Sequence, residues 1–420
     1  MTEFADVAHR DIDSDRLAEL SVAEYDQAEY EAMAELPNRA IMAFQPVVFH
    51  QLGYPCRVRR ESELFKYLDV MHDLRFEGDF RHLLGGLTRE EFDLVKRLTT
   101  RIVQFSESRF QRRALARASV LRSLNVLRHI RYLYGERRPR VFEVGPGCGY
   151  LGTLLMLEGY PYAATDVAQA FYLYQNWLWN FLAGGRVIEL VRTSDREPSW
   201  PDGISAGPPG GAVHVPWWEF VRRGLRSGAS YDLVICNHAL CEMHPDSLAF
   251  TVKSAKRLLA SPDGMPKAFA FEGWGARHER LSEITERFYR AGFIIVHSDT
   301  GIIVFALRDA PEGRHGLGLP FHHLPLKRRY VRRVRHVLRR GLSMLRCALW
   351  ELPLADRSYE PCEYASPENP FSRAIQSGRQ AQQHARTITL DQVKRFYAEL
   401  LASEDDASPD ERFLLDIWSG

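Results

Sequence analysis

The sequence predicts an α/β protein whose central part folds as a doubly wound, mostly parallel sheet. Short β-branched runs alternate with longer amphipathic segments between about residues 139 and 308, a pattern typical of strands covered by helices on both faces. A glycine-rich turn also follows the first of these runs, at 145–149, where such a sheet places its ligand. These two observations decide the fold class.

The expected elements follow in order along this stretch. Strands are expected at 141–144, 162–166, 213–215, 231–236 and 267–272, each followed by a helix, at 150–158, 168–182, 217–225, 247–259 and 278–291. Two last strands, 293–297 and 301–307, are joined by a Ser-Asp-Thr-Gly turn and predict a hairpin. The prediction is therefore seven strands that end in a hairpin. The segment 186–191 and the Pro/Gly-rich stretch 192–211 are an insertion that the pattern does not place.

The chain of 420 residues exceeds the roughly 250–300 at which a single core stops growing, so more than one domain is expected. Residues 1–138 show helical periodicity and predict a lid or substrate wall; the apolar positions of one helix face are Phe92, Val95, Leu98, Ile102 and Phe105. Residues 139–308 form the sheet domain. Residues 309–420 predict a helical, partly basic extension.

Composition excludes several classes of protein. Lys+Arg 55 against Asp+Glu 54 gives a net charge of +1, so no nucleic-acid partner is expected. The six cysteines include no C-x-x-C pair, which favours reduced thiols. The N-terminus is acidic, unlike a signal peptide, and no apolar run approaches the ~18 residues that span a bilayer. These features predict a cytoplasmic protein.

The glycine-rich turn predicts a nucleotide-type cofactor. Glycines let the chain turn sharply from strand to helix and approach a ligand closely, and Asp166, at the end of the second strand, is placed to accept both ribose hydroxyls. A pyrophosphate binder usually has a small residue where this chain has Tyr150. The carboxylate of Glu143 would repel pyrophosphate and suit an ammonium group. The details favour S-adenosylmethionine over NAD or FAD.

The run VFEVGPGCGYLG, together with Asp166 and the terminal hairpin, resembles class I S-adenosylmethionine-dependent methyltransferases over roughly 139–308. The resemblance implies a Rossmann-like seven-stranded methyltransferase sheet, with the methionine part held by Glu143 and the turn and the ribose by Asp166. The alternative is a Rossmann-like domain whose loop is only a tight turn. The residues expected at the cofactor are Glu143, Gly145, Pro146, Gly147, Gly149, Tyr150, Asp166, Trp217 and Asn237.

The segment after the fourth expected strand indicates which kind of acceptor atom is methylated. It lacks the Asn/Asp-Pro-Pro-aromatic pattern, which argues against adenine or glutamine N-methylation. His238 and Glu242 are four residues apart, so on a helical turn the carboxylate would orient the imidazole as a general base for a hydroxyl. One alternative is a buried His238 with an exposed Glu242. Another is a Mg²⁺ or Zn²⁺ site that adds His244 and Glu272.

The run ICNHALCEM also resembles a segment of sugar O-methyltransferases. The residues that carry this resemblance are Asn237, Glu242 and Met243. It favours O-methylation of a saccharide-like small molecule or glycan. The alternatives are a non-sugar metabolite or peptide acceptor, and a catalytically inactive binding subunit. Trp217 or Trp218 is expected to stack on adenine or a sugar ring, the other to pack in the core. Gln175 or Tyr172 is also placed to reach the crevice.

Two segments carry strong charge of opposite sign. Residues 1–35 hold eleven acidic residues and two arginines, while residues 327–346 hold nine Lys/Arg and no acid. The basic segment has an apolar stripe, so it predicts either a helix packed on the body and paired with acidic residues, or peripheral contact with an anionic membrane or glycan. Oligomeric state is not indicated.

Overall fold

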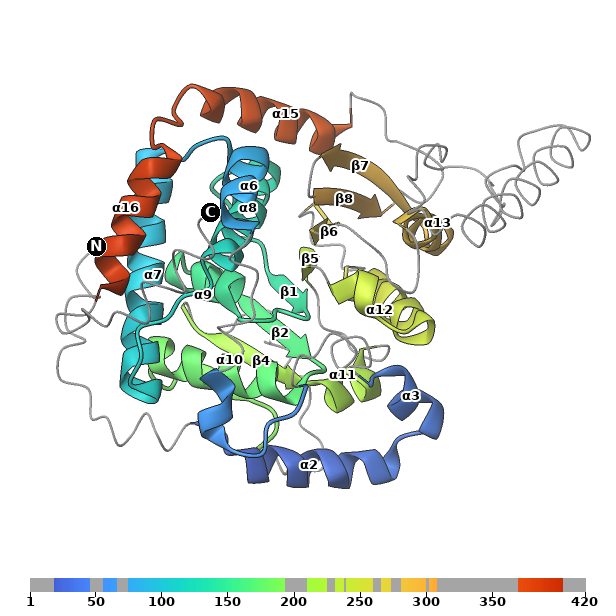
Figure 1. The fold of residues 1–420 in the computed structure, drawn as a ribbon. Coiled ribbons are helices and arrows are strands. Elements are labelled where there is room, and N and C mark those ends of the chain that lie inside the picture. The colour runs from blue at the N-terminus through green and yellow to red at the C-terminus, as the bar shows by residue number, and fades with distance from the viewer. Residues whose placement is uncertain are drawn as a thin grey trace, which may run out of the picture.

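The structure is a computed structural model that describes residues 19–45, 56–65, 75–192, 210–224, 231–237, 239–259, 266–272, 281–299, 302–307 and 369–402. Its centre is an eight-stranded sheet in the order β3-β4-β2-β1-β5-β6-β8-β7 (Figure 1). The expected basic segment 327–346 and most of the Pro/Gly-rich stretch 192–211 lie outside the described residues.

The strands are β1 (Val141–Val144), β2 (Tyr162–Asp166), β3 (Val187–Glu189), β4 (Ala212–Pro216), β5 (Leu233–Asn237), β6 (Ala268–Glu272), β7 (Phe293–Asp299) and β8 (Ile302–Leu307). β8 pairs antiparallel with both β6 and β7, and the other pairs are parallel. The α/β class, the doubly wound order and the terminal hairpin are confirmed. The strand count is corrected from seven to eight, because part of the unplaced segment pairs with β4 as β3.

Helices cover both faces of the sheet, since successive side chains of a strand point to opposite faces. Val141 packs in one apolar cluster and Phe142 in the other. The first face is covered by α7 (Arg89–Phe110), α8 (Arg117–Tyr134), α9 (Tyr150–Leu157) and α10 (Gln169–Ala183). The second is covered by α11 (Trp217–Arg223), α12 (Pro245–Leu258) and α13 (Leu281–Ala291), with the 3-10 helix η5 (Ala239–Glu242) before α12.

The N-terminal region begins with α2 (Val22–Glu35) and α3 (Asn38–Ala43), followed by η1 (Glu61–Phe65), α6 (Phe76–Asp79) and the π-helical turn η3 (Phe80–Leu84). α2 packs on α10 and α11 around a third apolar cluster. We call residues 19–45 and 56–65 the N-terminal cover. It lies along one end of the sheet, where it adjoins the ends of β2 and β4 (Figure 1).

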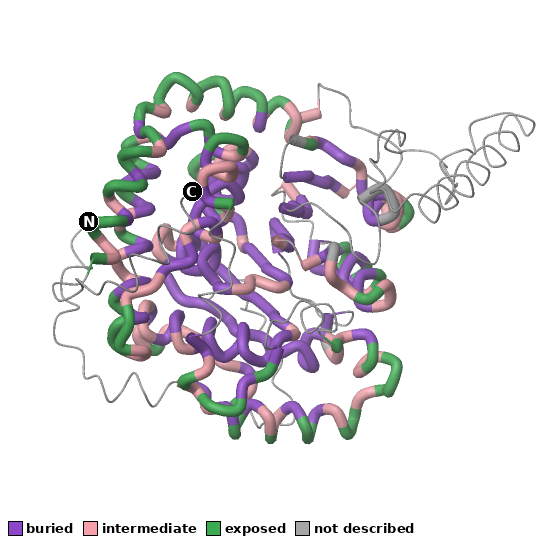
Figure 2. Tube along the Cα trace, in the orientation of Figure 1, coloured by how far each residue is buried: buried purple, intermediate pink, exposed green. Residues whose placement is uncertain are grey.

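The C-terminal helices α15 (Pro370–Gln383) and α16 (Leu390–Leu401) pack on α8, α7 and β7. Ile375 and Val393 are buried in the same cluster as α7, α8 and α9. The apolar core therefore crosses the boundaries expected near residues 138 and 308. In Figure 2 the strands are almost entirely buried, while α15 and α16 are largely exposed. The buried residues are Ile375 in α15 and Val393 and Tyr397 in α16.

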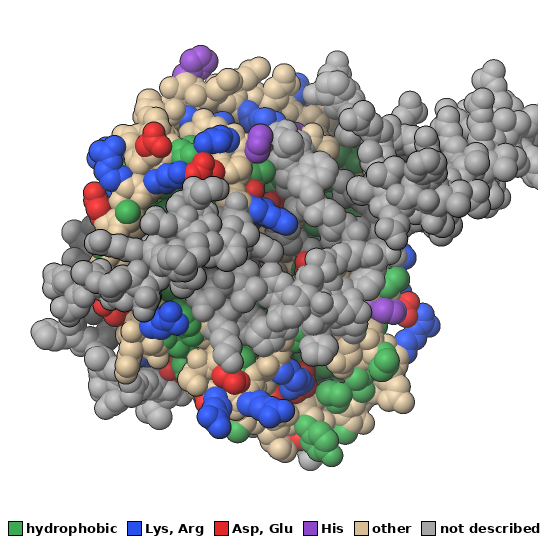
Figure 3. Space-filling model, in the orientation of Figure 1, with side chains coloured by type: hydrophobic (Ala, Val, Ile, Leu, Met, Phe, Trp, Pro, Cys, Tyr) green, Lys and Arg blue, Asp and Glu red, His purple; other side chains and the backbone are tan. Residues whose placement is uncertain are grey.

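Charged side chains of both signs lie interspersed on the described surface of the face in Figure 3. A search of the described helices for a stretch both long and apolar enough to cross a bilayer finds none.

Candidate functional site

The glycine turn connects β1 to α9 and is compressed between two neighbouring elements. Gly145, Gly147 and Gly149 have φ values of +72°, +59° and +70°, a region that side chains with a Cβ rarely adopt. A Cβ on Gly145 would also lie 2.6 Å from the side chain of Ala239, and one on Gly149 would lie 3.0 Å from Trp179. Glycine is required here both by conformation and by space.

Glu143 is the penultimate residue of β1, just before this turn, and its side chain is fully buried. Its carboxylate accepts a hydrogen bond of 2.6 Å from the Tyr162 hydroxyl and one of 3.0 Å from the Asn237 side-chain amide. Burial, together with the nearby charge of Asp166, raises the pKa of Glu143 to about 7. The Glu143 carboxylate therefore takes up a proton more readily than an ordinary glutamate.

Asp166 ends β2 beside the same turn and is 5% exposed. One carboxylate oxygen accepts from the Ala168 amide at 3.0 Å, and the other from the Gly147 amide at 3.3 Å and from the Gln175 side chain at 2.9 Å. Burial raises the pKa of Asp166 despite these donors. The bonds orient the carboxylate toward the turn, so its position at the end of the second strand is as expected.

Two buried carboxylates thus flank one glycine turn. Among the residues that the structure describes, neither Glu143 nor Asp166 forms an ion pair with Lys or Arg. Burying negative charge without a cation is costly. A ligand with positive charge would relieve that cost, whereas a pyrophosphate would add to it.

Asn237 lies at the carboxyl end of β5, next to Glu272 at the end of β6. The 3-10 turn that follows brings the half-buried Glu242 to the same edge of the sheet. His238 lies outside the described residues. His244 caps α12, where its Nδ1 accepts from the Asp246 amide at 3.2 Å. Within the described ranges, no group of three His, Cys, Asp or Glu could hold a metal ion.

Two expected cofactor residues have their side chains elsewhere. The Tyr150 ring is buried in the core under α8, with its hydroxyl 3.5 Å from the Ala116 amide. Trp217 donates a hydrogen bond of 2.7 Å to Glu29 and stacks on Phe44 at 5.9 Å. The Tyr150 ring is thus part of the core, and the Trp217 ring packs against the N-terminal cover. Pro146 lies in the turn between Gly145 and Gly147.

The sequence analysis missed a buried polar group beside Asp166. His214 in β4 is 0% exposed, and it contacts Gln175 of α10 and Glu189 of β3. A histidine inside the apolar run VHVP was the available signal, because an imidazole in a buried strand needs polar partners. Tyr172, which was expected to reach the crevice, instead stacks on His214 at 3.6 Å.

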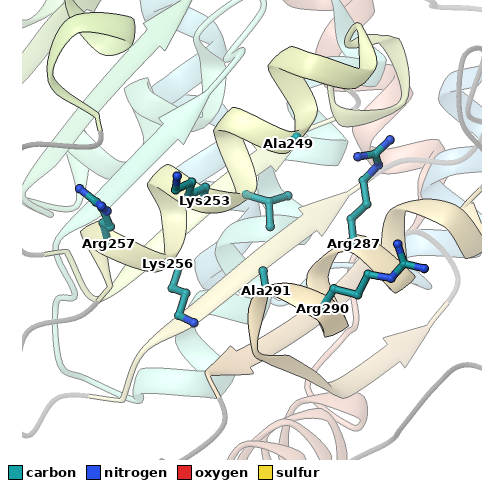
Figure 4. A pocket seen from close by; sticks show the side chains of 8 residues that line it. Ala249, Lys253, Lys256, Arg257, Arg287, Arg290 and Ala291 are labelled. Carbon is teal, nitrogen blue, oxygen red and sulfur yellow. The ribbon is translucent and has the colours of Figure 1, made fainter. Parts of the chain in front are cut away.

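A hollow lies between α12 and α13, on the face of the sheet that these helices cover (Figure 4). Its rim is cationic, so it would suit an anion, in contrast to the two carboxylates beside the glycine turn. The cations on its rim are Lys253, Lys256, Arg257, Arg287 and Arg290.

Comparison with known proteins finds no family model that matches the chain and no match among curated proteins. Solved structures do match. Magnesium protoporphyrin IX methyltransferase from Synechocystis, with bound S-adenosylmethionine, is 12% identical over 60% of this chain and 100% of that one, with a TM-score of 0.28. A TehB-like methyltransferase from Corynebacterium glutamicum is 14% identical over 44% and 98%, with a TM-score of 0.29. The 1,6-didemethyltoxoflavin-N1-methyltransferase of Burkholderia thailandensis is 16% identical over 46% and 89%, with a TM-score of 0.27.

Proposed function

We propose that this protein is an S-adenosylmethionine-dependent methyltransferase with a small-molecule acceptor. The observation that carries the proposal is the pair of buried carboxylates, Glu143 and Asp166, on either side of a turn whose glycines adopt positive φ values. The doubly wound sheet with its terminal hairpin supports it. The cofactor carries positive charge on its sulfonium and ammonium groups. That charge would pair with the two buried carboxylates, Glu143 and Asp166.

In this proposal each residue of the turn has a distinct task. Asp166 binds the ribose hydroxyls, Glu143 attracts the ammonium group, and the backbone from Gly145 through Pro146 to Gly149 lies against the methionine part. Asn237 orients the Glu143 carboxylate through its 3.0 Å hydrogen bond. The bound cofactor supplies a methyl group activated by the sulfonium charge, so catalysis consists mainly of positioning.

For the acceptor we propose a hydroxyl of a sugar or sugar-containing metabolite. His238 removes the proton of that hydroxyl, and Glu242, which η5 places at the same edge of the sheet as Asn237, orients the imidazole. A non-sugar natural product or a peptide is the second acceptor class. The alternative in which the protein is not an enzyme is a catalytically inactive binding subunit. A cytoplasmic location, and contact of 327–346 with an anionic membrane or glycan, remain predictions.

The test is calorimetric binding of S-adenosylhomocysteine to the wild type, to Asp166→Asn and to the control Asp246→Asn. Asp246 of α12 has an exposed carboxylate, which pairs with Arg39 of α3. The proposal expects the wild type and the control to bind alike and Asp166→Asn to bind more weakly by about 1–3 kcal/mol, the cost of unmet ribose hydroxyls. A well-folded wild type that binds neither S-adenosylhomocysteine nor S-adenosylmethionine would overturn it.

The acceptor class is tested separately, with methyl-labelled cofactor and a panel of sugar, non-sugar and peptide acceptors. Label transferred to a sugar hydroxyl supports the O-methylation proposal. Label found only on nitrogen, or only on the other classes, contradicts it. Cofactor binding without transfer to any acceptor favours the binding subunit.

A further inference from the structure

We propose that His214, in its doubly protonated form, is a positioning residue for the cofactor site: it fixes the amide of Gln175, which in turn holds Asp166 and the glycine turn. The inference rests on the proposed function for its ligand. It goes beyond that function because it assigns a task to β3 and β4, which do not contribute to the turn itself.

The orientation of the Gln175 amide is set by its partners. Its nitrogen lies 2.7 Å from the carbonyl oxygen of Gly147 and 2.9 Å from a carboxylate oxygen of Asp166. Both partners can only accept, so this atom must be the NH₂ group. The amide oxygen therefore faces the other way, 3.1 Å from Nε2 of His214.

Both ring nitrogens of His214 must then donate. Nε2 faces an amide oxygen, and Nδ1 lies 3.0 Å from the Glu189 carboxylate. Since neither partner can donate in this arrangement, the imidazole carries two protons and one positive charge. The ring is held by stacking on Tyr172 at 3.6 Å and by the edge of Trp179 at 4.8 Å.

The negative charge of Glu189 offsets the positive charge of the doubly protonated His214 ring in the core. Besides His214, its two oxygens accept from the Tyr172 hydroxyl at 2.5 Å, the Asn176 side chain at 2.8 Å and the Val191 amide at 3.0 Å. Apart from the imidazole, three donors thus surround the carboxylate, although the Tyr172 hydroxyl also lies 3.2 Å from the His214 carbonyl oxygen. Donors around a carboxylate favour its charged form, and a charged Glu189 requires a proton on Nδ1 of His214. A buried ion pair with its remaining sites filled is the arrangement that low dielectric permits.

The same network extends to the N-terminal cover. The amide oxygen of Asn176 accepts from the backbone amide of Leu20 at 2.8 Å, and Trp177 donates to the Leu20 carbonyl at 2.9 Å. Docking of the cover and orientation of the ribose carboxylate thus share one set of hydrogen bonds.

The consequence concerns the direction of the Gln175 amide. The Gly147 carbonyl and the Asp166 carboxylate both oppose a flip of this amide, since its oxygen would then face two acceptors. Without the His214 donor, the amide oxygen would be buried with no partner from this ring, so the amide would gain from moving away from Asp166 toward another donor. Asp166 would then lose a donor that holds it in place, and cofactor binding would weaken.

The experiment measures the dissociation constant of S-adenosylhomocysteine for the wild type, His214→Phe, Gln175→Met and the double variant. Phe keeps the ring stacking, and Met keeps the volume of Gln175. We expect each single variant to bind about tenfold more weakly, the worth of one hydrogen bond to a charged group. We expect the double variant to match Gln175→Met, because His214 acts through Gln175. Independent effects that multiply in the double variant would overturn the proposal, as would unchanged binding in His214→Phe.

Nitrogen-15 NMR of histidine-labelled wild type gives a test that needs no variant to fold. We expect, at pH 7, one buried histidine with two protonated ring nitrogens that exchange slowly with water. Among the described histidines, His129 is the other one buried, and burial lowers its pKa to about 3, so it stays neutral and serves as the internal control. A neutral ring at His214 would overturn the proposal. If the wild type shows the imidazolium but binds no cofactor, the proposed function fails and the hydrogen-bond assignment stands.

Discussion

Tyr162 donates a hydrogen bond of 2.6 Å to Glu143, and its ring supports the helix that follows the glycine turn. The support is close: a Cβ on Gly152 of α9 would lie 2.6 Å from the Tyr162 ring. Gly152, the fourth glycine of the motif, is therefore a packing residue, and it lets α9 approach β2 until Tyr162 reaches Glu143.

The first prediction is that Gly152→Ala disturbs this contact. The added methyl group must push the Tyr162 ring away, so we expect a loss of about 1–3 kcal/mol in the free energy of unfolding, typical of overpacking, and weaker cofactor binding. Urea denaturation and calorimetry measure the two effects. Gly78→Ala in α6 is the control, because a Cβ there meets nothing within 4 Å. Equal stability of the two variants would contradict the prediction.

The second prediction concerns pH. Burial raises the pKa of Glu143 to about 7 from the ordinary value of 4.5, so between these values the folded protein binds a proton more tightly than the unfolded chain. This group's contribution to stability is fully present below about pH 4.5 and is lost as pH rises through about 7. The loss amounts to roughly 3 kcal/mol.

Glu143→Gln removes that titration while keeping the side-chain shape. We therefore expect the variant to equal the wild type near pH 4.5 and to exceed it in stability at pH 8, measured by urea denaturation across the range. Glu90→Gln, whose side chain is 80% exposed, is the control and should follow the wild type. A constant offset between Glu143→Gln and the wild type at every pH would rule out the assigned cause.

Which parts of this site could be predicted from the sequence depends on the range of the interactions. The turn at 145–149 and the carboxylates at 143 and 166 were predicted because the turn directly follows β1 and β2 is the next strand along the chain. β3 was missed because three half-exposed residues carry too little alternation to indicate a strand.

The remainder of the site depends on contacts between distant segments. The pairing of His214 with Glu189 exists only because β4 lies between β3 and β2, an order that alternation along the chain does not encode. The hydrogen bond of Trp217 to Glu29, 188 residues away, likewise could not be predicted from local patterning. Local patterning indicated where a ligand binds, and long-range packing determined which side chains reach it.

The third prediction tests a buried ion pair far from the turn. Arg128 and Glu91 are each 2% exposed and share two hydrogen bonds, of 2.7 and 2.8 Å, while Gln382 of α15 also donates to Glu91. We expect Arg128→Met to cost about 3–5 kcal/mol of unfolding free energy, because it leaves a buried carboxylate without its cation.

The matched control is Arg39→Met, which breaks the exposed pair with Asp246 and should cost about 0–1 kcal/mol. The urea midpoints of both variants give the comparison. If Arg128→Met costs no more than the control, then the pair does not hold α7, α8 and α15 together.

The last prediction separates the proposed base from the metal alternative. We expect His238→Gln to lower the turnover of a methylated acceptor by about 10²–10⁴-fold, the usual worth of a general base, while the affinity for S-adenosylhomocysteine stays unchanged. His244→Gln should keep turnover, because that imidazole caps α12 through the Asp246 amide. Single-turnover kinetics with labelled cofactor measures both. If both variants lose turnover and a chelator abolishes that of the wild type, a metal ion is required and His238 is a ligand. If His238→Gln keeps full turnover, the acceptor reacts without this base, as an acceptor already ionised at neutral pH would.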